Sequence, residues 1–287
     1  MTGAVRRAVA RRQTAWIWLF FTAVVASLPL DLPTPVVLPV LAGLLSLAHV
    51  RPPRSTREPV AVAAPVRGRW VALNSPGSSV PSHGVRAYGQ AFAVDVLHPR
   101  PAGAPVALGW SLRTLAACDH SSFGEPVLAV ADGTVVAAGG GQRDHRARST
   151  WPGLLCMLVE GSVREAGGAR WILGNHVVLQ HDDQTFSAYA HLRRGSLRVR
   201  PGDQVESGQQ LAEVGNSGNS SEPHLHFQLM DRAVPSAAAG VPFRWTDAHV
   251  VAGEVDAGRG PGGERGGVPA NGQVFVVPSR QGAGKPA

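Results

Sequence analysis

Two long apolar runs stand near the N-terminus of the chain. They cover residues 15–30 and 36–50, contain no Asp, Glu, Lys or Arg, and are separated by Asp31 and two prolines. Each run of about 16 residues makes roughly 24 Å of helix, against a hydrocarbon core of roughly 30 Å. The pattern predicts an N-terminal membrane segment over residues 1–50 with one or two short spans. It leaves open a two-span hairpin and a single anchor whose second run lies in the interface. A cleaved signal peptide or a buried core helix fits less well.

The remaining hydropathy pattern is typical of a β protein. Short runs of Val, Ile, Leu and Ala are followed by turn signals, as at residues 126–130 before Asp132-Gly133. Residues 205–214 are expected to form a hairpin around Ser207-Gly208. Helical periodicity is weak and confined to residues 109–117 and 231–239. The predicted fold class is therefore all-β, a mostly antiparallel sheet or β-sandwich with one or two short helices, preceded by the N-terminal membrane helices.

Composition divides the chain into four parts. Residues 51–66 hold four prolines without an apolar period and are expected to be a linker. Residues 67–251 form the predicted globular domain. Residues 252–287 are rich in Gly and Pro and are expected to be a flexible tail, in which residues 273–278 (QVFVVP) have the composition of a docked strand.

The positive charge lies beside the apolar runs and not on the predicted domain. Residues 1–57 hold seven arginines and one acid, Asp31, so they account for most of the formal net charge of +7. A nucleic-acid-binding protein is expected to carry its basic residues on the folded domain, whereas arginines that flank apolar runs indicate membrane contact. We therefore expect no nucleic-acid partner. The two cysteines exclude a disulfide-rich scaffold and a four-cysteine zinc site, and leave open one bond between Cys118 and Cys156.

The segment with the most informative chemistry is Glu222-Pro-His-Leu-His-Phe-Gln-Leu229. Side chains alternate between the two faces of a strand, so His224, His226 and Gln228 share one face and three apolar side chains share the other. Burying two adjacent imidazoles without a partner is costly, which favours metal binding or catalysis over an ordinary polar face.

Three other positions offer the partners that a hydrolytic zinc site needs. Such a site has three protein ligands and an open position for water. Asp95 is a lone acid in an apolar run, His83 precedes it, and His191 ends the run Tyr189-Ala-His-Leu192. A carboxylate in such a run is either an unfavourable core charge or a ligand.

With these residues the chain resembles the lysostaphin/LytM-type zinc endopeptidases, which cut peptidoglycan cross-bridges and have the duplicated-hybrid-motif fold. The matching stretches, in the order of that family, are residues 123–136, 174–181, 189–192, 200–211 and 215–229. The last of these is the most specific. The resemblance implies a mostly antiparallel β-sheet with a narrow groove floored by the metal.

The resemblance also implies roles for five residues. His83, Asp95 and His226 would bind Zn²⁺, while His191 and His224 would flank the metal-bound water as base and as donor to the oxyanion. Eleven residues separate His83 from Asp95, where the family has three. The ligand pair therefore requires the intervening stretch to form a loop or an extra turn, and His98 is the alternative ligand.

Two functions fit this set of residues. The first is a membrane-anchored zinc metalloendopeptidase that hydrolyses peptide bonds in peptidoglycan cross-links or stem peptides, with the catalytic domain outside the cytoplasm at the cell membrane. The alternative is a catalytically inactive module that binds wall peptide or activates another cell-wall hydrolase. A biotinyl or lipoyl carrier domain is excluded, because Lys285 in the tail is the only lysine. The sequence gives no indication of the oligomeric state.

Overall fold

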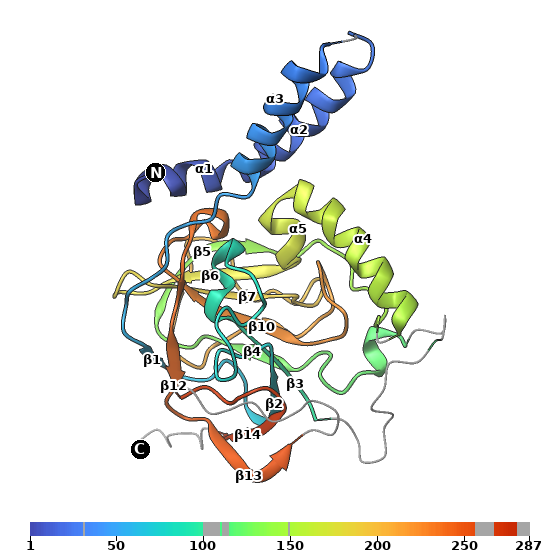
Figure 1. The fold of residues 1–287 in the computed structure, drawn as a ribbon. Helices are drawn as coiled ribbons and strands as arrows, with labels where there is room; N and C mark the ends of the chain where they lie inside the picture. The colour runs from blue at the N-terminus through green and yellow to red at the C-terminus, as the bar shows by residue number, and fades with distance from the viewer. Residues whose placement is uncertain (31, 100–109, 111–114, 149, 256–266, 280–287) are drawn as a thin grey trace, which may run out of the picture.

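The computed structural model describes residues 1–30, 32–99, 110, 115–148, 150–255 and 267–279. In this part of the chain a ten-stranded antiparallel sheet runs in the order β13-β14-β2-β3-β10-β7-β6-β5-β8, with β11 paired to β10 (Figure 1). The strands are β2 Gly68–Leu73, β3 Val94–Leu97, β5 Gly133–Gly139, β6 His176–Gln180, β7 Phe186–Ala190, β8 Gln204–Val205, β10 Leu225–Met230, β11 Gly240–Val241, β13 His249–Val255 and β14 Gln273–Val277. The predicted antiparallel β architecture is confirmed.

Two smaller sheets complete the β structure. Strands β4 (Pro126–Leu128) and β9 (Gln210–Glu213) pair antiparallel, and β1 (Val60–Val62) runs parallel to β12 (Phe243–Trp245). The predicted hairpin over residues 205–214 is wrong, because β8 pairs with β5 while β9 pairs with β4. The turn at Ser207-Gly208 thus connects two sheets.

Strand β10 lies at the centre of the molecule, and all six of its residues are buried. Leu225, Phe227 and Leu229 belong to the main apolar core, together with side chains from β2, β3, β6 and β7. The alternation of a strand directs His226 and Gln228 to the opposite face, where they are also buried. Their burial removes them from bulk water, so their polar atoms need partners within the protein.

The predicted bounds of the domain differ from the observed strands at both ends. Strand β1 lies inside the stretch that the sequence assigns to the linker, and β14 lies inside the predicted tail, where it pairs with both β13 and β2. The expectation that residues 273–278 contain a strand is confirmed. Cys118 and Cys156 are both free and exposed.

The N-terminal apolar runs form helices. Helix α1 (Gly3–Arg11) is followed by α2 (Gln13–Ser27) and α3 (Thr34–Ala48), which pack against each other as a hairpin that projects from the β domain (Figure 1). Among the described residues, no helix has both the length and the apolarity that crossing a bilayer requires. The membrane spans expected within residues 1–50 are therefore not supported by the helix lengths.

A long helix between β5 and β6 was not expected. Helix α4 covers Trp151–Gly167 and is followed by the short α5 (Ala169–Leu173). The expectation of one or two short helices is therefore wrong for this region. The Thr150 side chain caps α4 by accepting a hydrogen bond from the backbone of Gly153 at 3.3 Å, and Pro152 occupies the first turn, where its missing N–H is tolerated. The 3-10 turn η3 (Pro235–Ala237) falls in the stretch 231–239 of weak helical period. The other such stretch, 109–117, lies mostly outside the described residues, and η2 (Ala117–Asp119) begins only at its last residue.

Candidate metal centre

The pairing of β3 with β10 brings two predicted ligands face to face. Asp95 lies directly opposite His226 in the antiparallel register, and the Nδ1 atom of His226 is 2.9 Å from Oδ1 of Asp95. Both side chains are buried. Directly opposed residues in an antiparallel pair lie close enough for their side chains to interact, so the register alone accounts for this contact.

The eleven residues between His83 and Asp95 fold back on the sheet through a tight turn. This turn is η1 (Ala87–Phe92), in which Tyr88 and Gly89 both have positive φ. A Cβ atom on Gly89 would lie 2.8 Å from the Met230 side chain, so glycine is required there for both backbone and space. The turn returns His83 to the site, where its Nε2 atom is 3.1 Å from Oδ2 of Asp95. The long spacing is therefore compatible with the predicted ligand pair.

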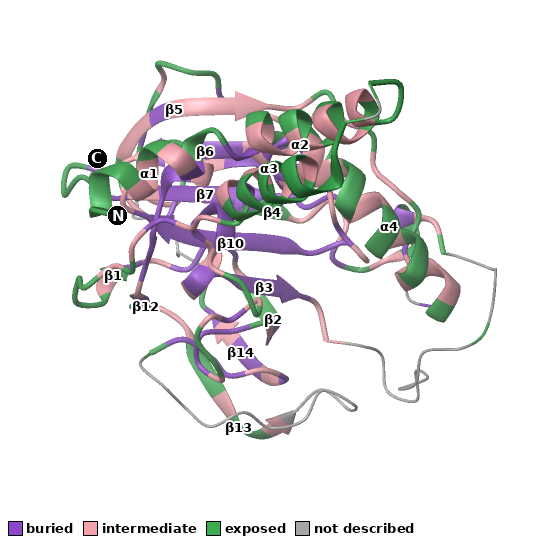
Figure 2. Ribbon diagram, turned by 45° about the horizontal axis from the view of Figure 1, so that its top comes forward, coloured by how far each residue is buried: buried purple, intermediate pink, exposed green. Residues whose placement is uncertain are grey.

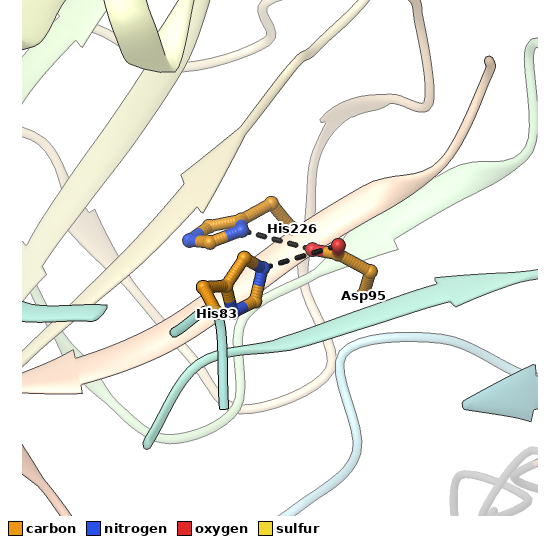
Figure 3. A group of neighbouring side chains, drawn as sticks. All are labelled: His83, Asp95 and His226. Atoms are coloured by element: carbon orange, nitrogen blue, oxygen red, sulfur yellow. Dashed lines mark hydrogen bonds and ion pairs between the residues drawn. The ribbon is translucent and has the colours of Figure 1, made fainter. Parts of the chain in front are cut away.

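Figure 3 shows the three side chains converging on the carboxylate of Asp95. One ligand atom from each of His83, Asp95 and His226 lies within 4.8 Å of the other two. Two imidazole nitrogens and a carboxylate oxygen are a donor set typical of Zn²⁺. His98, the alternative ligand, lies elsewhere, with its ring packed against that of Trp70 at 4.3 Å between centroids and an interplanar angle of 58°.

The hydrogen bonds around Gln228 define which nitrogen of His226 carries a proton. Nε2 of Gln228 donates to the carbonyl oxygen of Tyr88 at 2.7 Å, so its Oε1 atom is the one that faces Nε2 of His226 at 2.9 Å. An amide oxygen only accepts, so His226 carries a hydrogen on Nε2. In a neutral ring the lone pair of Nδ1 then points at the carboxylate of Asp95. Only a proton on that nitrogen or a cation between the two atoms relieves this repulsion, which suits a metal site.

His191 and His224 border the same cluster. The ring of His191 is 4.9 Å from that of His224 and 5.7 Å from that of His226, between centroids. Each ring donates from Nδ1 to a backbone carbonyl, His191 to Ser217 at 2.8 Å and His224 to Glu222 at 2.7 Å. In its neutral form each ring then has its lone pair on Nε2, and the Nε2 atom of His224 lies 3.6 Å from Oδ1 of Asp95.

Electrostatics within the cluster separate the charged groups from the neutral one. Burial works to raise the pKa of Asp95, but His83, His224 and His226 outweigh it and hold that pKa well below its usual range. Burial works to lower the pKa of His226, and the hydrogen bond and charge of Asp95 raise it above its usual value. For His191, burial and the neighbouring imidazoles outweigh the opposing effects of Asp95 and of the Ser217 carbonyl, and its pKa is well below the usual value. His191 is therefore neutral over the ordinary pH range.

Two residues that complete the site were not identified from the sequence as part of it. Asn74 donates from Nδ2 to Oδ2 of Asp95 at 2.8 Å, and its backbone has a φ of 42°. Gln228 lies on the face of the two histidines, so its position was evident but its role was not. His191 also has a positive φ, 61°. Such strained non-glycine residues are typical of functional sites, and local sequence does not reveal them.

One stretch of the chain matches a known protein family. Residues 158–238 match the family described as Peptidase family M23, a stretch that contains His191, His224 and His226 but not His83 and Asp95. The chain is 38% identical over 72 residues to the peptidoglycan DD-endopeptidase ShyA of Vibrio cholerae, covering 24% of this chain and 16% of ShyA. It is 39% identical over 70 residues to the murein hydrolase activator NlpD of Escherichia coli, covering 24% of this chain and 18% of NlpD.

The comparison with solved structures includes the catalytic domain of lysostaphin from Staphylococcus simulans. That match has 23% identity and a TM-score of 0.28, and covers 46% of this chain and 83% of the lysostaphin domain. The two curated relatives named above are matched over a much smaller part: the chain spans well under a third of ShyA and of NlpD. The resemblance predicted from the sequence motifs is confirmed as a match of residues 158–238 to peptidase family M23.

Proposed function

We propose that this chain is a zinc metalloendopeptidase that hydrolyses peptide bonds in peptidoglycan cross-links or stem peptides. One observation carries the proposal: Nδ1 of His226, whose other nitrogen donates to Gln228, faces the buried carboxylate of Asp95 at 2.9 Å. His83 reaches the same carboxylate at 3.1 Å, and two imidazole nitrogens around one buried carboxylate are a ligand set typical of Zn²⁺.

The residues present fit a catalytic Zn²⁺ ion. His83, Asp95 and His226 would supply three ligands, and the fourth position would face His191 and His224. When bound, the ion would lower the pKa of a water molecule and polarise the scissile carbonyl. His83 keeps Nε2 directed at Asp95 because its Nδ1 is 3.2 Å from the hydroxyl of Ser82, and Asn74 holds the second carboxylate oxygen.

The two remaining histidines suit the proton transfers of peptide hydrolysis. His191 is neutral, and its Nδ1–H bond to Ser217 leaves Nε2 free to take a proton. His224 is anchored in the same way through Glu222 and Ser220, so its Nε2 atom faces the centre of the site. In its protonated form this nitrogen donates to the oxyanion that develops on the carbonyl.

We also propose that the N-terminal segment holds the enzyme at the cell membrane, with the catalytic domain outside the cytoplasm. The α2–α3 hairpin supports this proposal, since large apolar side chains such as Trp18, Phe21, Val25 and Leu38 are exposed on it. A fully apolar, solvent-facing hairpin is unfavourable in water and favourable in lipid.

The test is metal analysis of the full chain beside Asp95→Asn and His226→Ala, followed by digestion of purified peptidoglycan. We expect about one zinc per chain in the parent protein, lost in both variants together with peptide cleavage. A parent protein without zinc would refute the metal site.

A second candidate is the regulatory module, which the similarity to the activator NlpD favours. In that case zinc would be retained without cleavage of any peptidoglycan fraction, and the chain would stimulate a separate wall hydrolase. The five histidine and aspartate side chains described above favour the enzyme, because an activator has no need of them.

A further inference from the structure

Helix α4 presents an apolar face to the outside of the molecule. None of its residues is buried. The positions that point outward repeat at helical spacing and are between 48% and 70% exposed: Trp151, Leu155, Leu158, Val159 and Val163. Residues at such spacings share one face of a helix. An exposed apolar face of this kind normally marks a surface that a membrane or another protein covers.

Glu160 and Arg164 of α4 point the other way, whereas Glu165 follows Leu158 by seven residues and lies on the apolar side. Glu160 accepts hydrogen bonds from Arg148 at 2.7 Å and from Arg164 at 3.2 Å. Glu165 accepts from Gln13 of α2 at 2.9 Å. Apolar side chains of α4 therefore face outward, while the two arginines that pair with the half-exposed Glu160 are only 11% and 12% exposed.

The apolar face of α4 continues into the N-terminal hairpin. Trp18 of α2 donates from its indole nitrogen to the carbonyl of Ala166, near the end of α4, at 3.0 Å. Figure 1 shows α4 leaving the base of the hairpin and running across its direction, and Figure 2 shows α2, α3 and α4 as mostly exposed or intermediate in burial. The outer faces of α2 and α4 thus meet at Trp18.

Arginine and tryptophan side chains gather where the two elements meet. Trp18 is 58% exposed, and Trp171 of α5 is 42% exposed with the guanidinium of Arg170 over its ring at 5.5 Å. Arg11 and Arg12 are exposed at the start of the hairpin, and no acid occurs before Asp31. Trp at the headgroup level, beside arginines that attract anionic lipids, is characteristic of a membrane interface.

We propose that α4 lies in the headgroup region of an anionic bilayer, beside the point where the α2–α3 hairpin enters it. This inference rests on the proposed membrane attachment and adds a second contact that fixes the orientation of the domain. A bilayer covers both elements at once, because a hairpin inserts along the membrane normal while an amphipathic helix lies flat. A second copy of the chain would have to cover two apolar surfaces that run in different directions.

The two native cysteines provide the test. Cys156 lies among the exposed positions of α4, and Cys118 is exposed on η2. Two single-cysteine forms of the full chain, each retaining one of these residues, are labelled there with an environment-sensitive fluorophore. A third form, Leu28→Cys without the native cysteines, reports on the hairpin. Each form is reconstituted with vesicles of phosphatidylcholine containing one part in four of phosphatidylglycerol.

We expect a blue shift at Cys156 and at Leu28→Cys on adding vesicles, and none at Cys118. Doxyl groups close to the headgroup end of the lipid chain should quench Cys156 more than groups near the methyl end, because an interfacial helix sits only about 5–10 Å deep. The double variant Leu158→Glu/Val159→Glu should abolish the Cys156 shift and leave that of Leu28→Cys. Val250→Glu, at an exposed apolar position on β13, is the matched control and should change neither.

The outcomes separate this inference from the proposals it rests on. A shift at Leu28→Cys without one at Cys156 refutes the contact of α4 and leaves the anchor intact. A Cys156 shift that appears without vesicles and grows with protein concentration assigns the face to a second copy and refutes it as well. Neither readout depends on zinc or on peptide cleavage.

Discussion

Asp95 and His226 lie 131 residues apart in the chain and directly opposite each other on β3 and β10, with Nδ1 of His226 2.9 Å from the carboxylate. Around this pair, Gln228 and Tyr88 define the hydrogen positions, and Asn74 and His83 hold the second carboxylate oxygen. From this arrangement we expect specific effects of substitutions on zinc binding, on the rate of peptide cleavage and on the free energy of unfolding.

Replacing Gln228 should weaken metal binding without touching a ligand. In Gln228→Met, Nε2–H of His226 loses its acceptor, so the ring is free to adopt the wrong tautomer. Loss of such an outer partner typically lowers metal affinity by about 10–100-fold. Competition with a chromophoric chelator measures the affinity, and circular dichroism confirms the fold. Unchanged metal affinity in a folded variant would show that Gln228 has no part in metal binding.

Replacing the two flanking histidines should separate turnover from metal content. His191→Ala and His224→Ala are expected to retain zinc and lose about 10²–10⁴-fold in turnover, the usual contribution of a general acid or base. Zinc analysis and peptide cleavage, measured on the same preparations, test this. If either variant loses its zinc, that histidine is a ligand and the assignment of roles must be revised.

Zinc should stabilise the folded chain. A ligand that binds only the native state stabilises it by about 2.7 kcal/mol at a free concentration 100 times its dissociation constant. Thermal unfolding with added zinc and with a chelator should therefore differ by several degrees in the parent protein. The difference should vanish in Asp95→Asn, which lacks the central carboxylate. A zinc-dependent shift that persists in this variant would place the binding site elsewhere.

Gly89 should tolerate no side chain. Gly89→Ala would place a Cβ atom at positive φ and 2.8 Å from Met230, so we expect a loss of about 2–4 kcal/mol in the free energy of unfolding. Gly84→Ala is the matched control, since Gly84 also has a positive φ but has open space around it. Its loss should be limited to about 1 kcal/mol of backbone strain. Urea titrations of both variants measure the difference, and equal losses would exclude the steric contribution.

Acid should destabilise the protein partly through His145. Burial, with the guanidinium groups of Arg164 and Arg148 beside it, lowers the pKa of His145 to about 4. In the unfolded chain His145 has its ordinary pKa of 6.5, so as the pH falls the unfolded chain takes up the imidazole proton before the folded one. The contribution of His145 to the free energy of unfolding is therefore complete above pH 6.5 and is lost as the pH falls toward about 4. His145→Gln keeps an acceptor for Arg164, which donates to the ring at 2.8 Å. Urea unfolding at a series of pH values should show a shallower dependence between pH 6.5 and 4 in this variant, and an identical slope would contradict the assignment.

The grouping of the candidate ligands was largely predictable because strand geometry is a local property. Alternation along β10 places His226 and Gln228 on one face whatever the strand pairs with, His224 directly precedes the strand, and the apolar neighbours indicate a buried strand. The same reasoning identified Asp95 as an acid in an apolar run. The antiparallel β architecture followed from the short apolar runs between turn signals.

Helix α4 was not predictable by the same means. Its apolar residues repeat at helical spacing, yet Pro152, Gly153, Gly161 and Gly167 lower its intrinsic helix propensity. Its apolar side faces outward, so the usual assumption that an amphipathic helix buries its apolar stripe does not apply. Packing against α2, which is remote in sequence, and the ion pair of Glu160 with Arg148 stabilise the helix.

Residue identity and strand period were therefore enough to nominate His83, Asp95, His191, His224 and His226 and to indicate an antiparallel β domain. The register of β3 against β10, the turn that carries His83 back across eleven residues, and the acceptor role of Gln228 follow from contacts between distant segments. Such contacts depend on how strands pair and pack throughout the molecule, and no local stretch of sequence contains that information.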